Sequence, residues 1–297
     1  MQKTKDYSEL DLTNSFIFSK VMTDERLCKR LLEIILGIDI LRIEYIEAEK
    51  DMKFAPDGKG VRLDVYVDDK QGTVYDIEMQ AIDTKELPKR SRYYQSMIDL
   101  TVLEKGESYE DLKKSYVIFI CMADVFDKGR YVYTFRNICV DDPSIELGDD
   151  ETKIFLNPYG SGEISEELSE FFGYLREHKP TGEFTKALDE SVTTAKGSAV
   201  WRKEYMTLEM EIRHAAHVAR EEGRAEGRAE GRAEGHSEGE TSRLVNQICK
   251  KLKKGLPVVQ IAEAVEEDEA RVQAIVEVAN KYAPDYDVEK IVKELLA

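Results

Sequence analysis

Asp64, Glu78 and Gln80 lie in one short stretch, Val61 to Gln80, whose pattern predicts two strands and a turn. Apolar and polar residues alternate on both sides of the polar, glycine-containing segment 68–72, as in a β-hairpin. Glu78 and Gln80 are two residues apart, so their side chains project from the same face of the second strand. Asp64, on the first strand, comes close to Glu78 if the hairpin register brings the two positions together.

These residue types suit metal-assisted chemistry on a phosphate. Two carboxylates that converge at a sheet surface form a hard oxygen site, which Mg²⁺ or Mn²⁺ prefers. Such an ion activates water and stabilises charge on a phosphate during displacement. We therefore interpret Asp64 and Glu78 as candidate metal ligands. Gln80 can orient a water molecule by hydrogen bonding, but it offers neither a positive charge nor a titratable proton.

The spacing of Asp64 and the run Glu78-Met79-Gln80 resembles the PD-(D/E)XK nuclease superfamily. More closely, it resembles the Rpn branch of recombination-promoting nucleases or transposases, which has Glu-x-Gln where other branches have Glu-x-Lys. Further segments resemble the first helix, the helix after the hairpin and a helix-to-strand region of that branch: 14–22, 89–99 and 105–120. The resemblance covers roughly residues 11 to 160.

The resemblance implies an α/β fold, a mixed sheet of the PD-(D/E)XK (restriction-endonuclease-like) type with helices on both sides. It also implies a divalent-metal-dependent DNA endonuclease that hydrolyses phosphodiesters in recombination or mobile-DNA processes. Asp64 and Glu78 would coordinate Mg²⁺ or Mn²⁺, and the carbonyl of Met79 would add a ligand. Gln80 would stand in the catalytic position that is a lysine in other branches.

One position departs from the family pattern. Ser15 stands where an acidic residue of the first helix is expected, and neither Asp11 nor Glu33 matches the pattern as a replacement. The net charge of −17 also opposes non-specific DNA binding, which relies on Lys and Arg to neutralise phosphates. Both features favour an alternative: a catalytically weak or inactive nuclease-fold protein that acts as an oligomerising interaction module.

A helix is predicted over 87–104, and basic residues cluster near its start. The cluster consists of Lys85, Lys89, Arg90 and Arg92. Arg90 and Tyr94 are four residues apart, so they share one face of the helix. We interpret Arg90, Arg92 and Tyr94 as candidate contacts to DNA phosphates. The alternative interpretation is a solvated helix face with core aromatic residues beneath it.

The carboxy-terminal part contains a low-complexity repeat, Gly-Arg-Ala-Glu, that runs from Gly223 to Gly235. In a helix, four residues advance about 400°, so each residue type forms a slowly winding stripe. Two such helices can match arginine stripes to glutamate stripes and approach closely over glycine and alanine. We predict a helical arm over 199–240 that makes the protein a homo-oligomer; a flexible tether is the alternative.

Residues 241–297 are predicted to form a small helical module that resembles a helix-turn-helix. Its second helix starts near the acidic run 266–269, whose charge has the wrong sign for a phosphate backbone. A packing module is therefore favoured over a DNA reader. The predicted domain order is a nuclease-like domain over 11–180, the arm and this module.

Composition places the chain in a reducing compartment. Charged residues make up 35% of it, and its four cysteines form no CxxC pair. The sequence contains no apolar run of the ~18 residues that a membrane span needs, and it opens with no signal peptide. We expect a cytoplasmic protein with no membrane partner.

Overall fold

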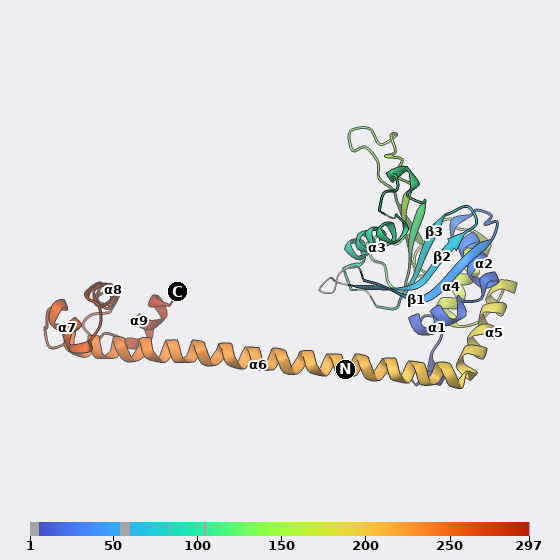
Figure 1. The fold of residues 1–297 in the computed structure, drawn as a ribbon. Coiled ribbons are helices and arrows are strands. Elements are labelled where there is room, and N and C mark those ends of the chain that lie inside the picture. Colours follow the sequence, from blue (N-terminus) through green and yellow to red (C-terminus); the bar gives the residue numbers. More distant parts are fainter. Residues whose placement is uncertain (1–5, 54–59, 83, 104, 297) are drawn as a thin grey trace. The chain divides into compact units, whose positions relative to one another are not determined.

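The computed structural model describes residues 6–53, 60–82, 84–103 and 105–296 (Figure 1). The chain divides into two compact units, Met1–Leu208 and Glu209–Ala297. Each unit has its own hydrophobic core, so each is described by itself.

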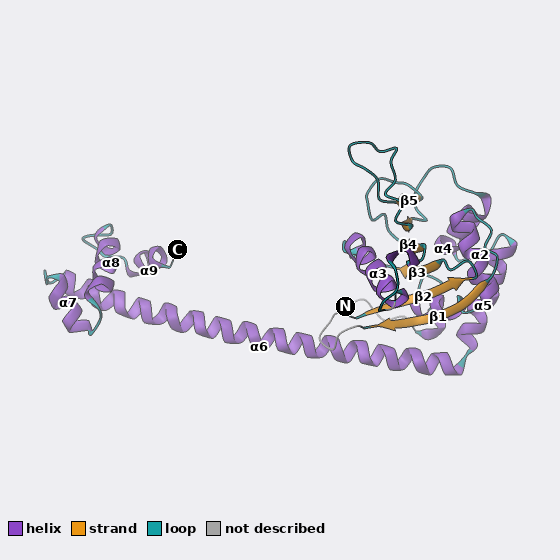
Figure 2. Cartoon of the chain, turned by 45° about the horizontal axis from the view of Figure 1, so that its top comes forward, coloured by secondary structure: helices purple, strands orange, loops and turns teal. Residues whose placement is uncertain are grey.

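Within the described residues, the first unit is built on a six-stranded mixed sheet with the order β1-β2-β3-β4-β6-β5 (Figure 2). The strands are β1 (Ile43–Met52), β2 (Val61–Asp69), β3 (Val74–Gln80), β4 (Ser115–Cys121), β5 (Val132–Phe135) and β6 (Glu151–Leu156). Strands β1, β2 and β3 are antiparallel, as are β5 and β6, whereas β3, β4 and β6 are parallel.

Helices cover both faces of the sheet, as predicted. One face packs against α1 (Ser15–Val21), α2 (Glu25–Leu36), α4 (Glu166–Glu177) and α5 (Glu183–Gly197). The other face packs against α3 (Leu87–Val102). Strand alternation explains the two layers, because Tyr75, Ile77 and Met79 of β3 enter the core on the α1 side. Val74 belongs to the core on the α3 side, which is therefore the face of Glu78 and Gln80.

Local sequence signals set the ends of these helices. The side chains of Asn14 and Asp24 accept hydrogen bonds from backbone N–H groups in the first turns of α1 and α2. Gly37 ends α2 in the left-handed region, with φ of 65°. Pro88 lies in the first turn of α3, where its missing N–H removes no helical hydrogen bond.

The first unit also contains a helix that the sequence patterns did not indicate. Pro180 and Gly182 suggest a boundary, but Gly182 precedes α5 as its N-terminal cap. Leu188, Val192 and Ala195 of α5 are buried in the core on the α1 side. Their spacing of four and three residues places them on one helix face. The first unit therefore continues through Leu208.

A 54-residue helix, α6 (Ala199–Leu252), begins in the first unit and ends in the second. It includes the whole Gly-Arg-Ala-Glu repeat, and the described side chains over 218–240 are exposed. Its last turns pack with α7 (Val258–Val265), α8 (Glu269–Asn280) and α9 (Val288–Leu295) around a separate core. Asp268 caps α8, so this helix begins within the acidic run noted in the sequence. Among the helices that the structure describes, none is long and apolar enough to cross a lipid bilayer.

Candidate active site

The hairpin register brings Asp64 and Glu78 together. Val65 pairs with Ile77 across β2 and β3, so the preceding and following residues, Asp64 and Glu78, lie opposite each other. The backbone N–H of Asp64 donates to Glu78 Oε1 at 2.7 Å. The backbone N–H of Met79 donates to Asp64 Oδ2 at 3.0 Å. The two carboxyl groups are therefore fixed to each other's strands.

Arg90 of α3 joins this pair to Gln80. Its Nη2 donates to Glu78 Oε2 at 2.8 Å, and its Nη1 donates to Gln80 Oε1 at 2.9 Å. Its Nε donates to the hydroxyl of Tyr94 at 2.6 Å. The guanidinium also lies 5.5 Å from the ring centroid of Phe119 on β4. A planar guanidinium suits such simultaneous contacts, and Arg90 thereby fixes the orientation of Glu78 and Gln80.

Asp76 is a third carboxylate of this region, and the sequence analysis did not single it out. It lies two residues before Glu78 on the same face of β3, and it is fully buried. Within the described part of the chain, neither of its carboxyl oxygens has a hydrogen-bond partner. The alternation of polar residues at 76, 78 and 80 was the available signal, because it places all three on one face.

Burial shifts the titration of all three carboxyl groups upward. Burial raises the pKa of Asp64 to about 6, against the N–H of Met79 and the charge of Arg90. Burial and then the neighbouring charge of Asp64 raise the pKa of Asp76 well above its usual range. The pKa of Glu78 is likewise raised, by burial and then by Asp76 and Asp64, and Arg90 opposes that rise. The site therefore resists carrying its full negative charge unless a further cation balances it.

The chemical type of the oxygen ligands in this site is the one that a hard divalent cation prefers. Asp64, Asp76 and Glu78 offer carboxylate oxygens on one face, and the orphaned oxygens of Asp76 have no competing protein partner among the described residues. In the part of the chain that the structure describes, however, no three Asp, Glu, His or Cys side chains are arranged as a ready-made metal centre. The Arg90 guanidinium holds one oxygen of Glu78 instead. The side chain of Met79 is buried on the opposite face, so its predicted role concerns its backbone carbonyl.

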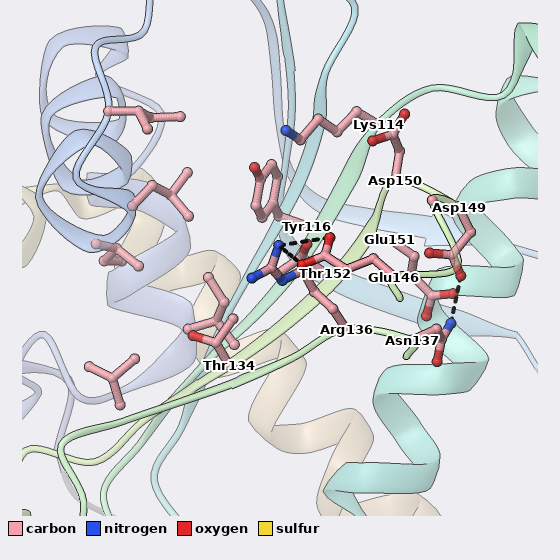
Figure 3. A pocket seen from close by; sticks show the side chains of 16 residues that line it. Lys114, Tyr116, Thr134, Arg136, Asn137, Glu146, Asp149, Asp150, Glu151 and Thr152 are labelled. Atoms are coloured by element: carbon pink, nitrogen blue, oxygen red, sulfur yellow. Dashed lines mark hydrogen bonds and ion pairs between the residues drawn. The ribbon is translucent and has the colours of Figure 1, made fainter. Parts of the chain in front are cut away.

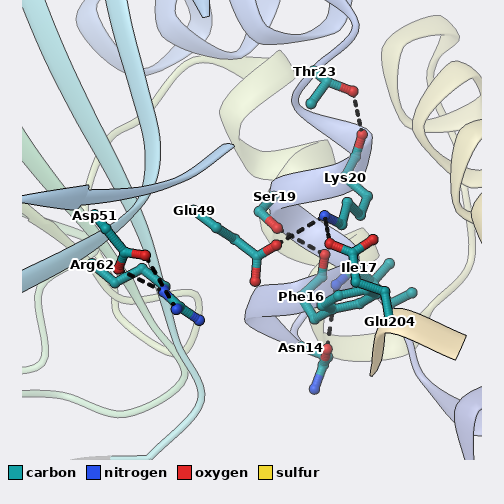
Figure 4. A network of polar contacts seen from close by, with 10 residues as sticks. All are labelled: Asn14, Phe16, Ile17, Ser19, Lys20, Thr23, Glu49, Asp51, Arg62 and Glu204. Atoms are coloured by element: carbon teal, nitrogen blue, oxygen red, sulfur yellow. Dashed lines mark hydrogen bonds and ion pairs between the residues drawn. The ribbon is translucent and has the colours of Figure 1, made fainter. Parts of the chain in front are cut away.

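The first helix contributes a lysine near this region (Figure 4). Ser15 is exposed at the start of α1. Lys20, one turn farther along α1, pairs with Glu49 of β1 at 2.8 Å and with Glu204 of α6 at 2.7 Å. The register places Glu49 opposite Asp64, and the charge of Glu49 contributes to the raised pKa of Asp64. Glu49 also has a φ of 54°, which is uncommon for a residue within a strand.

A groove beside the site is lined by the basic cluster that the sequence indicated. It has a volume of about 800 Å³ and is lined by Gly60, Val61, Arg62, Lys85, Glu86, Lys89, Arg90, Arg92, Tyr93, Tyr94 and Ser96. Arg90 is common to the groove and to the carboxylate site. Tyr94 is only 5% exposed and packs against Phe119, so its hydroxyl serves Arg90 within this structure. Contact of Arg90, Arg92 or Tyr94 with DNA stays a prediction.

A second pocket lies between the end of α2 and strands β4, β5 and β6 (Figure 3). Its prominent polar groups are already paired. Arg136 forms an ion pair with Glu146 at 2.8 Å, and Asn137 donates to Asp149 at 2.6 Å. The pocket contains none of Asp64, Asp76, Glu78 and Gln80, so it is separate from the carboxylate site.

Comparison with known proteins agrees with the geometry of the first unit. Residues 10–157 match the family model described as PD-(D/E)XK nuclease family transposase. The matched region runs from before α1 to the end of β6, and it includes the hairpin, α3 and the carboxylate site. No curated protein and no solved structure matches the chain. The mixed sheet with helices on both faces is the predicted fold, and the chain belongs to the PD-(D/E)XK nuclease superfamily through its residues 10–157.

Proposed function

We propose that the protein is a divalent-metal-dependent DNA endonuclease of the Rpn type, which hydrolyses phosphodiesters in recombination or mobile-DNA processes. The observation that carries the proposal is the pairing of Asp64 with Glu78 across the hairpin, with Gln80 on the same face. Membership of a nuclease family supports it. Mg²⁺ or Mn²⁺, bound by Asp64, Glu78 and the carbonyl of Met79, would supply Lewis-acid activation of water and charge stabilisation on the phosphate.

Gln80 would orient the attacking water. Its amide is held at both ends, because Oε1 accepts from Arg90 and Nε2 donates to the carbonyl of Ile82. A carbonyl oxygen has two lone pairs, so Oε1 retains one for a water proton. Gln80 cannot remove that proton, so it acts by placing the water rather than as a general base.

Substrate DNA would lie in the groove beside α3. Lys85, Lys89 and Arg92 line this groove, and cationic side chains there would contact successive phosphates. Arg90 lies where the groove meets the carboxylates, and two of its five N–H donors have no role in the contacts named above. This arrangement supports a phosphate contact by Arg90 at the scissile position. The net charge of −17 opposes DNA binding by the chain as a whole. Because basic side chains are gathered along the groove, DNA would meet a positively charged surface there.

The alternative function is a catalytically weak or inactive nuclease-fold protein that oligomerises through α6. One observation favours it: the Arg90 guanidinium already holds Glu78, a role that a metal ion would share. The absence of an acid at Ser15 also favours it. Under both functions, the exposed repeat of α6 supports homo-oligomerisation through matching arginine and glutamate stripes.

The test uses end-labelled single-stranded and duplex DNA with the full chain in Mg²⁺, Mn²⁺ or EDTA. The wild type should cut only with metal, and Glu78→Gln should not cut. The control is Glu47→Gln, which alters a carboxylate of β1 that pairs with Lys50 and should leave cleavage intact. A folded wild type that cuts none of these substrates with either metal would favour the interaction protein.

A further inference from the structure

The hairpin contains the buried aspartates Asp69 and Asp76, which differ in their hydrogen bonding. Asp69 accepts hydrogen bonds from the N–H groups of Gln71 and Thr73 at 2.8 and 2.9 Å, and from the hydroxyl of Tyr75 at 2.8 Å. Asp76 is buried as completely, yet within the described residues its carboxyl oxygens have no partner. Buried polar groups normally have partners, so an orphaned carboxylate calls for a specific explanation.

In the metal-free fold the ionised form of Asp76 is destabilised, because its carboxyl group is buried and has no partner among the described residues. A buried charge without a partner is destabilising by several kcal/mol in general. Tyr66, which pairs with Asp76 across the hairpin, directs its ring to Lys50 and Tyr45. Among the described residues, the carboxyl oxygens of Asp76 thus have no hydrogen-bond partner, and the next polar side chain on the same face of β3 is that of Glu78.

The charge of the site is unbalanced by an amount that one ion can cancel. Among the described residues, one guanidinium, that of Arg90, acts on all three carboxyl groups of Asp64, Asp76 and Glu78. The other charges that act on Asp64 have partners of their own: Glu49 pairs with Lys20, and Arg62 pairs with Asp51 (Figure 4). The site thus carries two uncompensated negative charges when its carboxyl groups are ionised. A single divalent cation makes it neutral.

We propose that Asp76 is the third functional carboxylate of this site, and that its negative charge makes the site select a divalent cation. The inference rests on the proposed function. Asp76 acts as a positioning residue: its charge deepens the potential at the ligands Asp64 and Glu78, and no contact of its own with the ion is required. Two carboxylates with Arg90 would leave one negative charge, which a divalent ion overcompensates.

The test measures stability and metal binding in the full chain rather than cleavage. Asp76→Asn keeps the shape of the side chain and removes its charge. At a pH high enough to ionise the carboxyl groups, the metal-free variant should melt at a higher temperature than the metal-free wild type, because an uncompensated buried charge is gone. Its affinity for Mn²⁺ by calorimetry should fall at least about tenfold, the scale for residues that support metal ligands. Asp76→Ser, which is smaller, repeats the comparison if the amide does not fit.

Asp69→Asn is the matched control, because it removes an equally buried carboxylate of the same hairpin. It should lower the melting temperature and leave Mn²⁺ affinity unchanged. The inference is overturned if Asp76→Asn binds Mn²⁺ as tightly as the wild type, or if the metal-free variant is less stable than the metal-free wild type at the pH at which the carboxyl groups are ionised. Those results leave the proposed function intact provided that Glu78→Gln still loses Mn²⁺. A wild type that binds no Mn²⁺ contradicts both.

Discussion

The β2–β3 hairpin with Arg90 of α3, and the exposed part of α6 around the repeat, use the same two charged groups, carboxylate and guanidinium, in opposite surroundings. Arg90 and Glu78 lie 2.8 Å apart with side chains 31% and 1% exposed. Arg224 and Glu221 of α6 lie 3.1 Å apart with side chains 56% and 55% exposed. Water screens the second pair, so its net contribution is small, whereas the first pair has lost that screening.

This difference separates two ways in which charge becomes useful. In the hairpin, burial leaves three carboxylates with one guanidinium, and the imbalance creates a demand for a cation. Along α6, repetition places exposed charges at intervals of four residues. These charges contribute little to stability within one helix, and they become stabilising when they pair with a second charged surface. The buried arrangement suits a metal-binding or catalytic site, and the exposed arrangement suits an extended helix–helix interface.

The substitution with the largest expected effect on stability breaks the buried ion pair. Arg90→Met keeps much of the side-chain volume and leaves Glu78 buried without its cation, which should cost about 3–5 kcal/mol of unfolding free energy. Chemical denaturation of the metal-free protein measures this loss, and Mn²⁺ should restore part of it. The matched control is Arg26→Met, which breaks an exposed pair with Asp24 and should have no measurable effect. Equal effects from the two substitutions would contradict the contrast between buried and exposed pairs.

The second effect is a pH dependence of stability that the buried carboxylate site should produce. The pKa of Asp64 is about 6 in the folded protein and near 3.8 in an unfolded chain. The folded state therefore holds this proton more tightly, and the resulting stability is present below pH 3.8 and lost as the pH rises through 6. Relative to Asp64→Asn, the metal-free wild type should lose on the order of 1–3 kcal/mol across this window. Denaturation curves for the two proteins that stay parallel across it would contradict the assignment.

The third effect concerns DNA binding in the groove. Lys89→Ala and Arg92→Ala should each lower the slope of log affinity against log salt concentration by about one, because each removes one phosphate contact. Binding is measured by fluorescence anisotropy in Ca²⁺, with the full chain. Lys250→Ala alters a basic residue near the end of α6 and should leave the slope unchanged. A reduced slope for Lys250→Ala alone would contradict DNA binding in the groove and would indicate that the second unit contacts the DNA.

The smallest effect tests the repeat. Gly227→Ala should stabilise an isolated helix by about 1 kcal/mol, and in this chain the added methyl group meets no atom within 4 Å among the described residues. If two arms approach over their glycine stripe, the same methyl group weakens association, which sedimentation equilibrium measures. We predict weaker association. Gly197→Ala, at the end of α5, is the control; unchanged or tighter association of Gly227→Ala would contradict close approach over glycine.

The sequence predicted the geometry that depends on strand alternation. The alternation placed Glu78 and Gln80 on one face of the second strand, whereas the register that brings Asp64 opposite Glu78 was left open by the sequence and is supplied by the structure. Arg90 and Tyr94 share a helix face, as their spacing indicated, and they contact each other. Local periodicity carries this information, so it is readable without the fold.

The sequence did not reveal what lies above those faces. Asp76 lies on the same face of β3 as Glu78. Its carboxyl oxygens have no partner among the described residues, and this depends on α3, which follows in the chain and packs over that face. The direction of Arg90, toward Glu78 rather than toward solvent, depends on the same packing. The position of Glu49 opposite Asp64, where it pairs with Lys20 of the first helix, depends on the pairing of β1 with β2.

The most direct test of the account is cleavage of supercoiled plasmid DNA with Mg²⁺ or Mn²⁺ by the wild type, Asp64→Ala and Glu78→Ala. The account predicts cleavage that requires the metal and falls about 1,000-fold or more in both variants, because several kcal/mol of charge stabilisation are lost. Cleavage that survives both substitutions would contradict the site. No cleavage by any of the three folded proteins would contradict the nuclease and leave the interaction module.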